Sequence, residues 1–186
     1  MTEKGGKWSK RVKPRPNDID QWTHYLHDPS NNAVAHDREI SSPRHYQWLG
    51  GPRWARHHDH LASLNAMVTA RGRLYYIIDE GLTATILTQS DWQLICRDAF
   101  NGTVLWKQKI NKWFTKWFPL KSGPASLPRR LVADGDKLYA PLSLMAPVSQ
   151  MDGKTGKVVQ SYPGTEGTEE IIAIDELLLE IGRAHV

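Results

Sequence analysis

The sequence holds a single cysteine, Cys96, which rules out an intrachain disulfide framework and a cysteine-based zinc cluster. Long hydrophobic runs are also missing, since no apolar stretch approaches the ~18–20 residues of a transmembrane helix. The stretch after Met1 is charged and has no apolar h-region, so it does not read as a secretory signal. A glycine-rich phosphate loop, a nucleophile elbow and an HExxH-type helix are absent too. The sequence therefore predicts no membrane span and none of these motif-defined enzymes.

A net positive charge is missing outside the amino-terminal arm, although the net charge of the whole chain is +4. Residues 1–16 carry six basic side chains and one acidic side chain, so the rest of the chain carries a slight negative charge. A nucleic-acid-binding domain would need positive charge gathered on a folded face. We therefore interpret residues 1–18 as a basic, proline-containing linker and expect no nucleic-acid partner.

Aromatic residues are unevenly used, with eight tryptophans against three phenylalanines, and this favours short strands with aromatic anchors. From about residue 61, apolar runs alternate with tight-turn residues. Residues 67–78, 131–140 and 171–179 each consist of an apolar run, a small charged or glycine-containing turn and a second apolar run. These patterns predict an antiparallel all-β fold.

A second pattern places an aspartate four residues before a glycine and follows it with a β-rich run. It occurs at Asp98 and Gly102 and again at Asp152 and Gly156, 54 residues further on. The pair Asn101-Gly102 predicts a hairpin with a type I′ turn. Repeats at this kind of spacing favour a β-propeller, whereas similar hairpins can also arise by composition in any antiparallel protein.

Residues 96–106 and 150–160 resemble the tryptophan-docking motif of quinoprotein-like (PQQ-repeat) β-propellers, Ala-x-Asp-x-x-Thr-Gly-x-x-x-Trp. The first stretch has Cys96 in place of the alanine, where we expect an inert core thiol, and the second has Gln160 in place of the tryptophan. The resemblance implies that residues 19–180 form part of a propeller with antiparallel four-stranded blades, about two to three of them. It also implies a structural role for the matching residues, which are Asp98, Gly102, Trp106, Asp152 and Gly156.

The resemblance further implies a bacterial protein of the periplasm or cell envelope that acts as a binding or scaffolding module for a protein partner or a small molecule. The alternative is a quinone- or metal-dependent oxidoreductase, similar to the dehydrogenases that bind PQQ with calcium. The chain has no vicinal cysteine pair, and no residue matches a calcium-ligand motif of that family. The sequence leaves open whether the protein is an enzyme.

The densest polar cluster in the sequence lies at residues 50–60. We predict that this segment forms the entrance to the binding or active site. His58 and His60 would share one face of a strand and could hold a transition metal, with His45 or His36 as a third ligand. In a helical turn, His57 and His60 would share a face instead; in an ordinary loop these histidines would bond to the backbone. The candidate ligand-binding residues are Arg53, Trp54, Arg56, His57 and Asp59.

The last six residues, 181–186, equal the translation of ATC GGA AGA GCA CAC GTC, one frame of a common short-read sequencing adapter. The next adapter triplet is a stop codon. We therefore expect residues 181–186 to be a library scar and the chain to be a fragment of metagenomic origin. The alternative is a genuine tail of ordinary composition.

Overall fold

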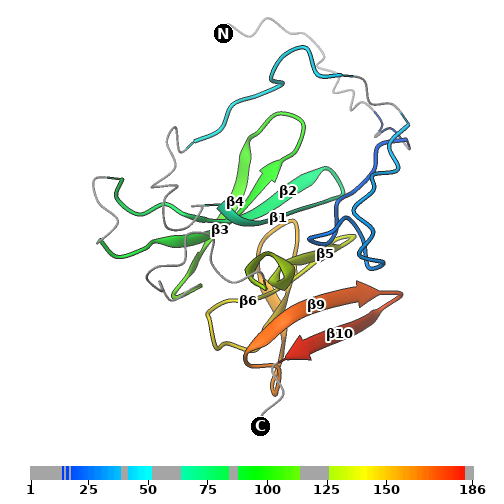
Figure 1. Ribbon diagram of the computed structural model, residues 1–186. Helices are drawn as coiled ribbons and strands as arrows, with labels where there is room; N and C mark the ends of the chain where they lie inside the picture. Colours follow the sequence, from blue (N-terminus) through cyan, green and yellow to red (C-terminus); the bar gives the residue numbers. More distant parts are fainter. Residues whose placement is uncertain are drawn as a thin grey trace, which may run out of the picture.

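The computed structural model describes residues 14, 16, 18–38, 42–51, 64–83, 88–113 and 126–182. Within these ranges the chain forms two four-stranded antiparallel sheets, one two-stranded hairpin and one short 3-10 helix, η1 (Figure 1). The first sheet contains β1 (Leu64–Ala70), β2 (Arg73–Asp79), β3 (Trp92–Asp98) and β4 (Val104–Ile110). After η1 (Leu127–Arg130), the second sheet contains β5 (Val132–Asp134), β6 (Lys137–Pro141), β7 (Val148–Asp152) and β8 (Val158–Tyr162). The hairpin contains β9 (Thr168–Ile174) and β10 (Leu177–Gly182).

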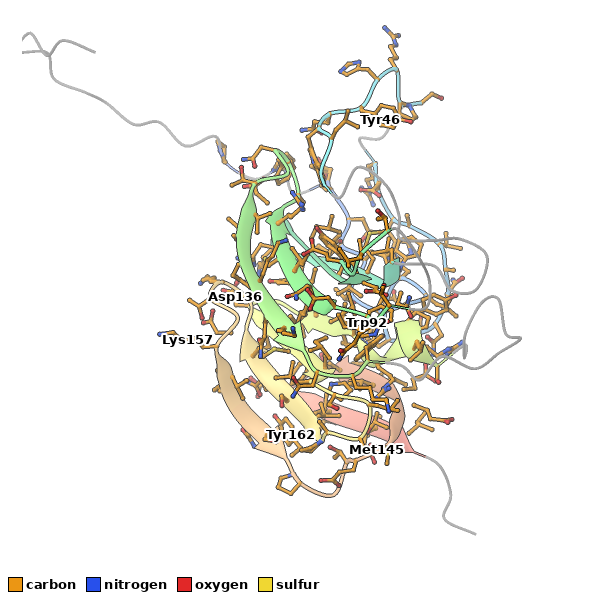
Figure 2. All side chains as sticks on the ribbon, turned by 90° about the vertical axis from the view of Figure 1, so that its left-hand side faces the viewer. Tyr46, Trp92, Asp136, Met145, Lys157 and Tyr162 are labelled. Atoms are coloured by element: carbon orange, nitrogen blue, oxygen red, sulfur yellow. The ribbon has the colours of Figure 1, made fainter. Side chains whose placement is uncertain are left out.

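Both sheets are simple meanders in which the spatial order of the strands is their order in the chain. The first sheet, the second sheet and the hairpin follow one another through the molecule, as the green, yellow and orange-to-red ribbons show (Figures 1 and 2). The three predicted strand–turn–strand segments coincide with the pairs β1–β2, β5–β6 and β9–β10. The prediction of an antiparallel all-β fold is therefore confirmed, and neither sheet closes on itself in the part of the chain described here.

The predicted type I′ turn at Asn101-Gly102 is wrong, although the hairpin that it connects is present. Only Gly102 has a positive φ, of 74°, whereas a type I′ turn needs one at both central residues. The Asp98 carboxylate accepts hydrogen bonds from the amides of Phe100 and Asn101, at 2.8 and 3.1 Å. This bonding favours a longer loop, closed by a hydrogen bond from the Gly102 amide to the Asp98 carbonyl.

The main core lies between the two sheets and combines side chains from both of them. The central strands β2 and β3 are buried along most of their length, because their apolar runs meet neighbours on both faces. The outermost strands β4 and β8 are largely exposed. A smaller cluster joins the second sheet to the hairpin through Val132, Tyr139, Val148, Ile171 and Ala173. The first sheet, the second sheet and the hairpin, here called the three units, thus pack against one another in chain order. The first strand of each four-stranded sheet lies inside, and the last strand lies outside. Figure 2 shows Trp92 among the packed side chains and Tyr46, 84% exposed, on a loop away from the sheets.

Residues 21–24, here called the strap, cross the ends of the first strands of all three units. Each contact falls on the last residue but one of a strand, which is Thr69 in β1, Ala133 in β5 and Ala173 in β9. Trp22 and Thr69 exchange two hydrogen bonds, of 2.6 and 2.8 Å. The amide of Ala133 donates to the Thr23 carbonyl at 3.0 Å, and that of Ala173 donates to His24 Nε2 at 3.1 Å. Three successive strap residues therefore bond to equivalent positions of three successive units.

Ile181 and Gly182, the first two residues of the expected library scar, belong to β10 and pair with Glu170 and Thr168 of β9. Residues 183–186 lie outside the described ranges. Across those ranges, no helix combines the length and the apolar character needed to cross a bilayer.

Candidate functional site

The polar cluster predicted at residues 50–60 lies almost wholly outside the described residues. This applies to all seven candidate ligand-binding and metal-binding side chains, which are Arg53, Trp54, Arg56, His57, His58, Asp59 and His60. The two histidines suggested as a third ligand are described. His45 is exposed, whereas His36 belongs to a cluster with Asp20 and His27.

Two of the repeat residues, Trp106 and Gly156, meet where the first sheet contacts the second. Trp106 reaches from β4 to the turn between β7 and β8, where its Nε1 donates to the Gly153 carbonyl at 3.0 Å. Its ring lies against Gly156, and a Cβ on that glycine would be 2.8 Å from the indole. Because Gly156 also has a φ of +73°, both the backbone and the neighbouring ring require a glycine there.

Asp98 and Asp152 each hold the turn that follows their strand. Asp152 Oδ1 accepts hydrogen bonds from the amides of Lys154 and Thr155, at 2.8 and 2.9 Å, as Asp98 does in its own turn. These bonds, led by that from Thr155, lower the pKa of the Asp152 carboxyl against the effect of desolvation. Both carboxylates therefore act on their own turns in this structure.

A residue that the sequence analysis missed, Trp48, repeats the contact of Trp106 one unit earlier. Its Nε1 donates to the Ala99 carbonyl at 2.9 Å, and a Cβ on Gly102 would lie 2.5 Å from its ring. Ala99 follows Asp98 just as Gly153 follows Asp152. The spacing of tryptophan and glycine could have identified Trp48 from the sequence. Trp48 precedes Gly102 by 54 residues, and Trp106 precedes Gly156 by a similar 50. No Asp-x-x-x-Gly pattern stands just before Trp48 to draw attention to it.

The Gly153 carbonyl collects further donors from the first sheet. Tyr75 Oη donates to it at 3.2 Å, and Cys96 Sγ lies 3.8 Å away. Cys96 is fully buried, and burial raises the pKa of its thiol to about 12. This thiol is therefore protonated and shielded at neutral pH, as expected for an inert core cysteine.

Among the described residues, one group of side chains has the composition of a metal site: Asp20, His27 and His36. One potential ligand atom from each lies within 4.8 Å of the other two. Asp20 Oδ2 is 2.6 Å from His27 Nε2 and accepts the His36 amide at 2.5 Å. The imidazoles of His27 and His36 meet edge to face, with ring centroids 5.0 Å apart.

The backbone that presents this cluster begins at the strap. The amides of Thr23 and His24 both donate to the His27 carbonyl, which makes a tight turn with His27 at a φ of +77°. The Asp20 amide donates to Asp37 Oδ1 at 2.7 Å and ties the two arms of the loop together. His27 is buried, whereas His36 is exposed, so the cluster opens to solvent on one side.

The surroundings of the cluster are acidic. Residues 18–37 contain four aspartates and no lysine, arginine or glutamate. Burial opposes ionisation of Asp20, but hydrogen bonds led by that from the His36 amide outweigh it and lower the pKa of this carboxyl. Asp28 Oδ2 lies 3.2 Å from His27 Nδ1, a buried atom that has no hydrogen-bond partner. This arrangement can bind a cation.

Trp22, whose ring meets His27 edge to face at 5.3 Å, also lines an apolar hollow. The hollow has a volume of about 470 Å³ and is lined by Trp22, Tyr25, β1 residues 64–69 and Pro128. Met67 is half exposed within it. Its size and apolar lining suit a small molecule or a protruding side chain of a partner.

No protein-family model matches the chain, and no curated protein matches its sequence. The resemblance to propeller repeats therefore rests on the motif residues and on the contacts that they make.

Proposed function

We propose that the chain is part of a PQQ-repeat-like β-propeller, with the architecture of quinoprotein alcohol dehydrogenases, that serves as a binding or scaffolding module of the bacterial cell envelope. One observation carries the proposal. Each described four-stranded sheet receives a tryptophan from the preceding part of the chain on the glycine of its last turn, with the indole N–H bonded to the carbonyl of the residue after the turn aspartate.

A repeated contact of this kind supports radial repetition. Trp106 makes this contact from β4, the outer strand of the first sheet, and Trp48 makes the same contact from a loop that precedes that sheet. Recurrence of one docking contact is what a ring of units related by a common rotation requires. The strap adds independent support, because it bonds to equivalent residues of β1, β5 and β9. Equivalent ends of the first strands therefore lie near one another, as around a common axis.

A binding role is supported by the hollow beside β1 and by its exposed apolar side chains. The cell-envelope location rests on the resemblance to propeller proteins of that compartment. Because a fold hosts many functions, the architecture alone supports neither an enzymatic nor a non-enzymatic role.

An experimental structure of the chain tests the architecture. We expect the rotation from the first to the second sheet to equal that from the second sheet to the hairpin, at about 45–90° per unit, the step of a four- to eight-bladed ring. A regular translation along the axis at each step would indicate a solenoid and would overturn the proposal.

Reconstitution separates the binding module from the quinone-dependent oxidoreductase. The purified chain is incubated with PQQ and calcium, passed through a desalting column and examined for a bound chromophore and for alcohol-dependent dye reduction. We expect neither signal. A stoichiometric chromophore with dye reduction would favour the oxidoreductase, with its site near residues 50–60.

A further inference from the structure

We propose that Asp20, His27 and His36 bind a divalent transition-metal ion, of which Zn²⁺ suits the site best, with water completing its coordination. The site is separate from the predicted cluster at residues 57–60. It is also independent of the propeller proposal, since it depends only on the loop that flanks the strap.

The donor set selects the class of metal. Two imidazole nitrogens and one carboxylate oxygen suit zinc, whereas calcium and magnesium prefer an all-oxygen shell. Zinc sites with three protein ligands keep the fourth position for water. The exposed His36 side of the cluster provides access for that water.

The geometry is close to that of an occupied site. Bonds of about 2.0–2.1 Å in a tetrahedral shell place ligand atoms about 3.3 Å apart. The three ligand atoms already lie within 4.8 Å of one another, and His27 Nε2 is 2.6 Å from Asp20 Oδ2. An ion would replace this hydrogen bond, which requires the two atoms to separate slightly and the His36 ring to turn inward.

The outer shell also fits. Histidine ligands usually have a carboxylate at the ring nitrogen that does not touch the metal. Asp28 Oδ2 lies 3.2 Å from His27 Nδ1, the ring nitrogen that would face away from the ion, and so occupies the position of such an outer carboxylate. The left-handed backbone of His27 is a further sign of a constrained position.

The test is zinc titration of the tag-free chain after EDTA treatment and dialysis, followed by calorimetry. Cobalt(II) serves as a spectroscopic probe of the coordination. We expect one equivalent of zinc, visible cobalt bands of a four-coordinate ion, and a higher unfolding midpoint with zinc, because the ion binds only the folded chain.

Variants identify the ligands. His36→Ala removes an exposed ligand and Asp20→Asn preserves shape, so both are expected to fold; circular dichroism checks this. Each should lower zinc affinity at least about 100-fold, since loss of a mere outer-shell partner costs 10–100-fold. His45→Ala and the double variant His58→Ala, His60→Ala are matched controls that should bind zinc like the parent.

The outcomes are decisive. Loss of zinc binding and of the midpoint shift in folded His36→Ala, with both controls unchanged, supports the site. No stoichiometric binding by the parent chain overturns it, as does full binding by folded His36→Ala. Loss of binding only in the His58→Ala, His60→Ala variant would assign the metal to residues 57–60 instead.

Discussion

At the scale of single residues, Gly156 has no Cβ, and this lets the second sheet lie close to Trp106 of the first sheet. Gly156 has its φ at +73° and its Cα against the Trp106 ring, where a Cβ would lie 2.8 Å from the indole. Gly135 has a similar φ of +57°, but a Cβ added there would lie 3.9 Å from its nearest neighbour, Arg71 Nε. The two glycines therefore separate the effect of backbone conformation from that of crowding.

We expect Gly135→Ala to lower the free energy of unfolding by about 1 kcal/mol, the cost of a left-handed alanine. Gly156→Ala should lower it by about 3 kcal/mol, because the Trp106 ring must also move. Urea unfolding followed by tryptophan fluorescence measures both. Equal losses would show that crowding against the Trp106 ring adds nothing to the cost of the backbone conformation.

His24 should make the stability depend on pH. Burial lowers its pKa to about 4, against the attraction of Asp28, Asp134 and Glu170, and Nε2 accepts the Ala173 amide only when unprotonated. The unfolded chain, with a histidine pKa near 6.5, therefore binds the proton more readily than the folded chain. The resulting stabilisation is complete above about pH 6.5 and is lost as the pH falls towards 4.

The expected loss between about pH 7 and about pH 4.5 is on the order of 2 kcal/mol. Urea unfolding at several pH values measures it, with His24→Gln as the reference that lacks the titrating ring. If both proteins showed the same pH dependence, the buried imidazole would not be its source.

At the scale of elements, the hairpins follow from local sequence, and the contacts between them do not. Apolar runs broken by Arg71-Gly72 or by Gly135 predict strands and turns within a few residues. The docking of Trp48 on Gly102 depends on residues far apart in the chain. The predicted metal site centred on His58 and His60 because these are neighbours in sequence, whereas His27 and His36 meet only through the turn at residues 23–27. His45 or His36 was expected as a third ligand to the former pair; the structure places His36 beside His27, and His58 and His60 lie outside the described residues.

The β9–β10 turn offers a gain in stability. Asp175 and Glu176 both have left-handed φ values, of 47° and 66°, in a two-residue loop that favours glycine at its second position. Glu176→Gly should raise the free energy of unfolding by about 0.5–1 kcal/mol.

The exposed turn residue Glu166, which has no positive φ, provides the matched control. Glu166→Gly should lower the free energy of unfolding, because it only adds freedom to the unfolded chain. Thermal unfolding measures both variants. A loss of stability in Glu176→Gly would contradict the assigned strain.

At the scale of the whole molecule, the strap is the segment that bonds to every unit. Its bond to the hairpin joins His24 to Ala173, and the cluster that joins the hairpin to the second sheet is smaller than the main core. The hairpin should therefore depend more on the strap than the first sheet does.

We expect His24→Leu, which keeps an apolar volume but removes the acceptor, to speed hydrogen exchange at the Ala173 amide by at least about tenfold. Amides of β2 and β3 should keep their protection, and His45→Leu should change neither region. Unchanged protection at Ala173 would show that the strap does not hold the hairpin in place.

The strap also dictates an order of events during synthesis. Its residues leave the ribosome before the described strands β1 to β10, yet its last partner, Ala173, follows about 150 residues later. Contacts so distant in sequence form late and slow folding, because the intervening chain must first be organised. At each stage of translation the strap would have a partner for only part of its length, and His24 Nε2 would lack its Ala173 donor until β9 emerged. Assembly of the three units is thus completed through a segment that was made before all three of them.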